Sequence, residues 1–96
     1  MTIDDILDIV TSRYSVRLSD LQSKKRTRSI ALPRQVCMYL ARKLTGHSLE
    51  EIGGYFGGRD HTTVLHASRV VDSKRDEDPL FNAVVMKLTE DIQARL

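Results

Sequence analysis

The sequence has little cysteine, proline or aromatic side chain, and each shortage excludes a class of protein. The single cysteine, Cys37, cannot form an internal disulfide, and it and the three histidines lack the CxxC or HxxxH spacing of a zinc module. Two prolines and five glycines among 96 residues are too few for a disordered or collagen-like chain. The five Tyr and Phe residues are too few and too dispersed to form a base-stacking platform for single-stranded nucleic acid. We therefore expect a globular domain without disulfides, metal or a single-strand binding surface.

Long hydrophobic runs and catalytic motifs are also missing. No apolar stretch approaches the roughly 20 residues of a membrane-spanning helix, and acidic residues stand where a signal peptide needs basic ones: Asp4, Asp5 and Asp8. The sequence contains no GxxxxGK[ST], GxSxG or HExxH motif and no carboxylate cluster like that of two-metal nucleases. These absences predict a cytoplasmic binding protein that is not an enzyme.

Positive charge is concentrated in one part of the chain. The net charge is +2, but the segment from Arg13 to Lys43 holds nine basic residues and one acidic residue, Asp20. The centre of this surplus is Ser23-Lys24-Lys25-Arg26-Thr27-Arg28. Such a surplus suits a phosphate-binding surface, because neutralising phosphates releases condensed counterions. Nucleic acid is the leading expected partner, and a solvated basic loop is the alternative interpretation.

Apolar residues recur at helical spacing throughout, and no segment alternates as a strand does. The pattern predicts an all-α fold in a single domain, residues 1–96. We expect helices over residues 2–13, 33–46, 48–56, 61–75 and 79–96, and one helical turn at residues 18–21. Thr2-x-x-Asp5 is a capping box for the first helix, and Ser19 is expected to cap the single turn, whose leucines, Leu18 and Leu21, fold back on the core.

Pro33 suits the first position of a helix, where its missing N–H costs nothing. In that arrangement Arg34 and Gln35 occupy the first turn, where free backbone N–H groups and the helix dipole favour a phosphate. Cys37 falls in the apolar stripe of this helix and is interpreted as a small buried side chain. The last helix is expected to close the core with a stripe that begins at Leu80 and continues through Phe81, Val84, Val85, Leu88 and Ile92.

Residues 48–75 predict two helices joined by a tight turn. Ser48 and Glu51 form a capping box at the start of the first helix, and Gly57-Gly58 ends it. Asp60 is placed to cap the second helix, whose first turn is polar and short-chained. A helix-turn-helix places such a first turn in the major groove, although capped helix pairs also occur in purely structural bundles.

The residues of this turn and of the helix start after it resemble those of a known protein family. The segment resembles the signature of the C-terminal domain (domain IV) of DnaA, the bacterial replication initiator, with the sequence Gly57-Gly58-Arg59-Asp60-His61-Thr62-Thr63-Val64-Leu65-His66-Ala67. The similarity extends upstream through residues 20–28, 33–35, 39–42, 44–45 and 48–53, and weakens after Ala67. It implies a compact, all-helical, Trp repressor-like domain that binds DnaA boxes, short sites similar to TTATCCACA, in duplex DNA at the replication origin.

The resemblance also implies which residues contact DNA. Base contacts fall on Asp60, His61 and Thr62 in the major groove and on Arg26 in the adjacent minor groove. Contacts with the DNA phosphate backbone fall on Lys24, Lys25, Thr27, Arg28, Arg34, Gln35, Arg42, Arg59 and Thr63. The chemistry suits these roles, since Asp can accept from cytosine N4 and Thr can pack against a thymine methyl. For Asp60 a pure N-cap is the competing interpretation, because both roles use the same oxygens.

The resemblance sets further expectations about partners and context. The expected partner is double-stranded DNA in the bacterial nucleoid, and the domain is expected to be monomeric and to need no cofactor. ATP would belong to an ATPase domain that full initiators carry and this sequence lacks. The chain is then either an excised domain or a stand-alone regulator that uses similar sites. A helical protein-interaction module, whose basic loop serves an acidic partner, is the alternative from another class.

Overall fold

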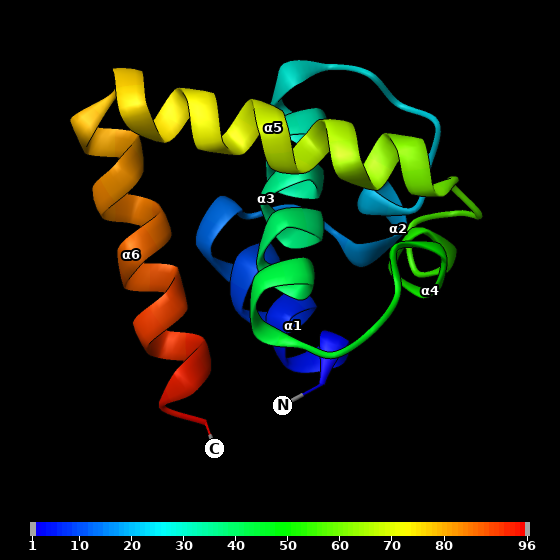
Figure 1. The fold of residues 1–96 in the computed structure, drawn as a ribbon, viewed down its shortest axis with the longest axis horizontal. Coiled ribbons are helices and arrows are strands. Elements are labelled where there is room, and N and C mark those ends of the chain that lie inside the picture. The colour runs from blue at the N-terminus through cyan, green and yellow to red at the C-terminus, as the bar shows by residue number, and fades with distance from the viewer. Residues whose placement is uncertain (1, 96) are drawn as a thin grey trace.

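Helices make up most of residues 2–95, the part of the chain that the computed structural model describes, and this range contains no strand. The all-α prediction is therefore confirmed. Across the described residues there are six helices: α1 (Ile3–Tyr14), α2 (Leu18–Leu21), α3 (Arg28–Leu44), α4 (Leu49–Gly54), α5 (His61–Glu77) and α6 (Pro79–Gln93). The α5 helix crosses in front of α3, α1 lies behind the lower half of α3, and α6 runs down one side (Figure 1).

The core forms around α3, which packs against α1, α2, α4 and α5. Val36, Cys37 and Leu40 of α3 are fully or almost fully buried. The prediction that Cys37 is a buried apolar side chain is confirmed, and burial raises the pKa of its thiol far above the ordinary value. The same core cluster includes buried side chains from every other helix: Ile6, Val10, Leu21, Ile52, Val64, Val71 and Leu88.

The last helix closes the core with a shorter stripe than the sequence predicts. Phe81, Val85, Leu88 and Ile92 are buried. The expectation for Leu80 is wrong, since 81% of this side chain is exposed. The Asp78 carboxylate accepts hydrogen bonds from the backbone N–H groups of residues 80 and 81, and the helix begins at residue 79, as predicted, with Phe81 and not Leu80 on its buried face. The buried face then starts at the third residue of α6.

The start of α3 corrects the prediction for Pro33. The helix begins at Arg28, with Thr27 in the N-cap position, so that Pro33 lies inside it. A proline there removes one backbone hydrogen bond, to the carbonyl of residue 29. The extra turn nevertheless buries Ile30, and the backbone N–H groups of residues 30 and 31 both donate to the Thr27 carbonyl. The basic segment before α3 is consequently shorter, and Arg34 and Gln35 do not occupy the first turn.

The short helix α2 also differs in detail from its prediction. Its N-cap position is Arg17 and not Ser19, and the Asp20 carboxylate accepts from the Arg17 backbone N–H at 3.4 Å. Leu21 is fully buried, whereas 44% of Leu18 is exposed, so only one of the two leucines packs on the core. A helix of four residues can turn few side chains toward the core, and in α2 that side chain is Leu21.

Candidate nucleic-acid interface

The turn between α4 and α5 is built from caps and two glycines. Ser48 and Glu51 form the predicted reciprocal capping box at the start of α4. Gly57 and Gly58 have φ angles of 79° and 75°, in the left-handed region that side chains other than glycine rarely adopt. These two residues reverse the chain within a few positions, so that α5 begins at His61, as predicted.

Gly53 sets how closely α4 approaches the start of α5. The Arg59 backbone N–H donates to the Gly53 carbonyl at 3.0 Å. A Cβ atom on Gly53 would lie 2.0 Å from the Arg59 carbonyl oxygen, far inside van der Waals contact. This position therefore requires glycine, because any side chain would push the turn away from α4.

The first turn of α5 exposes polar side chains around a capped end. Asp60 is the predicted N-cap, and its Oδ1 accepts from the Thr63 backbone N–H at 2.9 Å and from the Thr63 hydroxyl at 3.0 Å. These bonds stabilise the charged carboxylate and lower the pKa of Asp60. His61 and Thr62 are both exposed. This turn presents an imidazole, a hydroxyl and a methyl group to solvent, beside a carboxylate.

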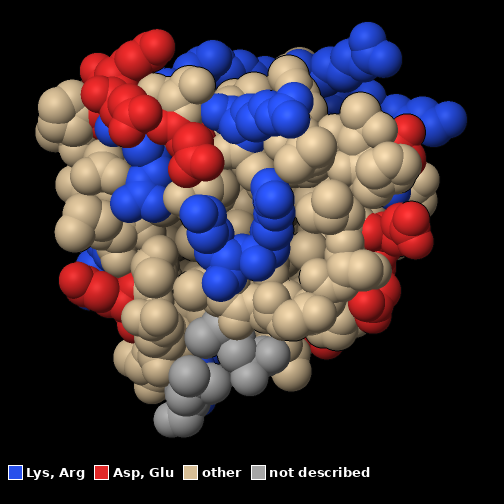
Figure 2. Space-filling view, in the orientation of Figure 1, with Lys and Arg blue, Asp and Glu red and all other residues tan. Residues whose placement is uncertain are grey.

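A short basic loop, residues 22–27 between α2 and α3, lies beside this turn. Its side chains Lys24, Lys25, Arg26 and Thr27 are exposed. Lys25 pairs with Asp20 at 2.9 Å, and this bond lowers the pKa of Asp20. In Figure 2, Lys and Arg side chains gather along the upper edge of the molecule, over α5 and the chain that enters α3. Acidic side chains gather at the upper left, where α5 ends.

Arg34 does not have the surface position that the DNA-backbone assignment requires. It is 6% exposed. Its Nε donates to the Leu21 carbonyl at 2.8 Å, and its terminal nitrogens donate to the carbonyls of residues 20, 23 and 25 at 2.9 to 3.0 Å. The expectation of a direct phosphate contact is therefore corrected, because four of the five guanidinium N–H donors are already used inside the protein. Arg34 instead ties α2 and the basic loop to α3.

Arg59 is also directed inward. One terminal nitrogen donates to the Phe56 carbonyl, and the other donates to the Ser23 carbonyl at 2.6 Å. The same two segments meet again where the Gln22 side-chain amide donates to the Tyr55 carbonyl at 2.9 Å. Arg59 thus joins the turn to the basic loop, and since the residue is only partly buried, a phosphate contact would use the N–H groups that these two bonds leave over.

A basic groove brings several of the expected contact residues together. Arg26, Arg28 and Gln35 line it from the loop and the first turns of α3, and Val70 and Lys74 line it from α5. Lys74 was not among the residues expected from the sequence, and its ammonium lies 5.2 Å from the centre of the Phe81 ring. The spacing of four between Val70 and Lys74 on one helix face is the signal that could have indicated it.

Arg42 stands apart from these residues. It is exposed in the last turn of α3, fourteen residues after Arg28, which corresponds to about 21 Å along a helix. The structure therefore does not place Arg42 with the basic loop. Any phosphate that it contacts belongs to a different stretch of DNA backbone.

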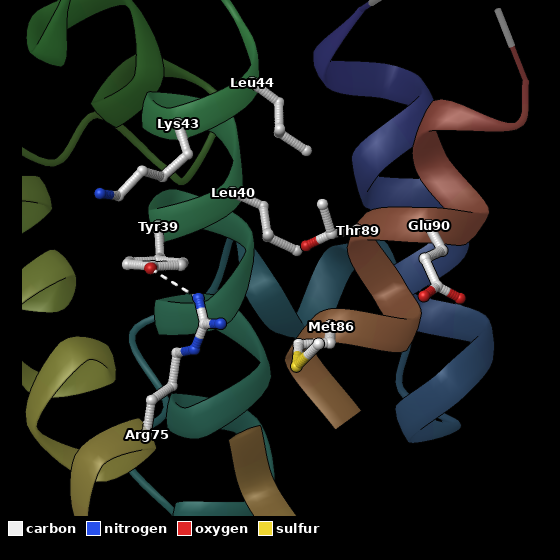
Figure 3. Close-up of a pocket in the computed structure, with 8 residues that line it drawn as sticks. All are labelled: Tyr39, Leu40, Lys43, Leu44, Arg75, Met86, Thr89 and Glu90. Carbon is white, nitrogen blue, oxygen red and sulfur yellow. Dashed lines mark hydrogen bonds between the residues drawn. The ribbon is translucent and has the colours of Figure 1, made fainter. Parts of the chain in front are cut away.

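A second groove lies at the other end of α5, between α3 and α6. Its lining includes Tyr39, Lys43, Arg75, Met86 and Glu90. Arg75 reaches from α5 to donate to the Tyr39 hydroxyl at 2.8 Å, as Figure 3 shows. Arg75 also donates to the Asn82 side chain at 2.6 Å. The hydrogen bonds of Arg75 thus link α5 to α3 and α6 across this groove. Most of the length of α5 separates the groove from the first turn of that helix.

Residues 2–95 contain neither a membrane-spanning helix nor a cluster of metal-ligating side chains. No helix there combines the length and the hydrophobicity needed to cross a bilayer. In the same part of the chain, no three side chains of His, Cys, Asp or Glu gather closely enough to hold a metal ion.

The comparison with protein families agrees with this geometry. The family described as "Bacterial dnaA protein helix-turn-helix" matches residues 3–71, a range that runs from the start of α1 into α5. The match includes the basic loop, the turn that joins α4 to α5, and the exposed residues at the start of α5, and it ends before α6. The chain therefore belongs to the DnaA helix-turn-helix family of DNA-binding domains that act in replication initiation.

Proposed function

We propose that this chain binds DnaA boxes in duplex DNA and thereby initiates or regulates chromosome replication at the origin. One observation carries the proposal: the first turn of α5, with His61 and Thr62 exposed, stands beside an exposed basic loop, and Arg59, directly before the Asp60 cap, is hydrogen-bonded to that loop. A helix-turn-helix uses the first turn of its second helix to read base edges in the major groove. A basic loop beside it is suited to the neighbouring minor groove.

In the major groove, each exposed side chain has its own chemistry. The Thr62 methyl group can pack against a thymine methyl, and the His61 imidazole can hydrogen-bond to a base acceptor. Asp60 uses Oδ1 for its cap, so a base contact would involve the other carboxylate oxygen and a cytosine N4 donor. The cap and the base contact are then compatible, since each uses a different oxygen.

In the minor groove, Arg26 is the proposed reader. Its side chain is exposed and lies at the mouth of the basic groove. An arginine gains energy in a narrow A·T-rich minor groove because the negative potential is strongest there. The remaining proposed contacts hold the phosphate backbone without reading sequence: Lys24, Lys25, Thr27, Arg28, Gln35, Arg42 and Thr63. For Thr63 the hydroxyl would first have to leave Asp60.

The protein is proposed to act through binding alone, as a monomeric domain with no cofactor. ATP binding and hydrolysis would belong to an ATPase domain of a longer initiator. If the chain works by itself, it would regulate replication by competing for the same boxes. Both forms require the same interface, so the proposal about DNA binding does not depend on which form occurs.

The test is fluorescence anisotropy on a labelled TTATCCACA duplex and on a duplex of scrambled sequence, across a salt series. We expect a preference of about a hundredfold or more for the box, with affinity for both duplexes falling steeply as salt rises. Equal, weak binding to the two duplexes would overturn the proposal. It would favour a helical interaction module whose basic loop serves an acidic protein.

A further inference from the structure

The shape of the basic loop is set from inside the protein. Four consecutive or nearly consecutive carbonyls, those of residues 20, 21, 23 and 25, accept hydrogen bonds from the buried Arg34 guanidinium. Bonds from a charged donor are stronger than those between neutral groups. The last of these carbonyls belongs to Lys25, directly before the exposed Arg26. The backbone that carries Arg26 is therefore fixed on its N-terminal side by Arg34.

A second guanidinium extends this arrangement to the helix turn. The Ser23 carbonyl accepts from Arg34 at 3.0 Å and from Arg59 at 2.6 Å. The proximity of the two cations and the burial of Arg34 both lower the Arg34 pKa. The shared Ser23 carbonyl offsets this repulsion, and both bonds to it require the loop, the turn and α3 to keep one relative position.

We propose that Arg34 is a positioning residue for DNA recognition, which holds Arg26 in place and, through the Ser23 carbonyl shared with Arg59, fixes the basic loop relative to the first turn of α5. This inference rests on the proposed DNA-binding function. A loop that is ordered before binding loses less conformational entropy when it meets DNA. Arg34 thus acts on affinity without touching the nucleic acid.

The first experiment examines the loop in the absence of DNA. ¹⁵N relaxation of the backbone amides of residues 22–27 is compared between the native protein, Arg34→Met and a matched control, Arg75→Met. Arg75 is also a partly buried, doubly bonded arginine, but it lies at the far end of α5. We expect the heteronuclear NOE of the loop amides to fall in Arg34→Met and to stay at the native value in Arg75→Met. A native NOE in a folded Arg34→Met protein would overturn the positioning role, whatever the DNA result.

The second experiment is a double-mutant cycle on the TTATCCACA duplex. If Arg34 positions Arg26, then Arg26→Ala should weaken binding about tenfold in the native background but less than twofold in the Arg34→Met background. An equal loss in both backgrounds would show that Arg34 contributes only to folding. A native protein that fails to prefer the box would overturn the proposed function instead, and the NOE comparison would still decide the role of Arg34 in the loop.

Arg59→Met provides a second route if Arg34→Met does not fold by circular dichroism. Arg59 is only partly buried, and its removal leaves the contacts of Arg34 with residues 20, 21 and 25. We expect Arg26→Ala and His61→Ala to be non-additive in the native protein and additive in Arg59→Met. Additive losses in the native protein would overturn the link between the loop and the turn.

Discussion

Arg34 of α3 and Arg59 of the turn donate to one acceptor, the backbone carbonyl oxygen of Ser23, at 3.0 and 2.6 Å. One side chain comes from α3 and the other from the turn between α4 and α5, and the carbonyl between them belongs to the basic loop. This shared bond joins the proposed reader of the minor groove to the proposed reader of the major groove. The two elements therefore keep a fixed relative position before DNA is present.

Arg34→Ala should lower the free energy of unfolding by about 2 to 4 kcal/mol, because it removes four buried or partly buried hydrogen bonds from a charged donor. Urea denaturation followed by circular dichroism measures this change. Arg42→Ala is the matched control, since Arg42 is exposed in the same helix and should change stability by no more than about 0.5 kcal/mol. Equal stabilities for the two variants would contradict the structural role given to Arg34.

His61→Ala and Thr62→Ala should each remove about 1 to 3 kcal/mol of discrimination between the box and scrambled duplexes, with little loss of non-specific affinity. The reason is that both side chains are exposed in the first turn of α5, which is proposed to meet base edges, and neither packs in the core. Anisotropy titrations on both duplexes measure the effect. A loss of the same size on every sequence would show that these residues contact only the DNA backbone.

Gly53→Ala should destabilise the protein by about 1 to 3 kcal/mol, because the added Cβ would collide with the Arg59 carbonyl. Gly54→Ala is the natural comparison, since a Cβ on Gly54 meets nothing within 4 Å and the residue is helical. That variant should be as stable as the native protein or about 0.5 to 1 kcal/mol more stable. Thermal melting of the pair tests this, and a stable Gly53→Ala protein would contradict the described approach of α4 to the turn.

Asp60→Asn should reduce the dependence of stability on acid pH. The hydrogen bonds from Thr63 lower the Asp60 pKa below its ordinary value of 3.8 in the folded state. A group with a lowered folded pKa stabilises the fold above its unfolded pKa, and this contribution is lost as the pH falls through the folded pKa. The advantage of the native protein over Asp60→Asn should therefore be complete above about pH 5 and shrink below about pH 4. Urea denaturation at pH 6, 4 and 2.5 measures it, and an advantage that does not change with pH would refute the assignment.

Local chemistry made the helix ends near the turn predictable from the sequence. Ser48 with Glu51, the two glycines, and Asp60 each have a short-range preference that no tertiary contact reverses here. The buried position of Cys37 followed in the same way from helical periodicity. The exposed positions of His61 and Thr62 also agree with the sequence analysis, because polar residues in the first turn of an amphipathic helix lie opposite its apolar stripe.

The misassigned residues depend on contacts between distant parts of the chain. Pro33 favours the start of a helix, but the burial of Ile30 extends α3 by a turn before it. Arg34 and Arg59 carry charge and lie beside the expected interface, so that sequence alone suggests a surface role for both. Their roles follow from the backbone carbonyls of the loop, whose directions are not encoded by any local pattern. Leu80 was misassigned because it lies in the first turn of α6, at the end of the apolar stripe, and helical spacing alone does not show that the core ends at Phe81.

In the proposed function, two separate elements of this chain, the first turn of α5 and the basic loop, read two separate parts of one site. The most direct measurement replaces each base pair of the TTATCCACA duplex in turn and titrates the native protein, Arg26→Ala and His61→Ala on every duplex. We expect each variant to become indifferent to its own contiguous block of base pairs, and the two blocks to differ. Uniform losses across all positions, for either variant, would contradict the claim.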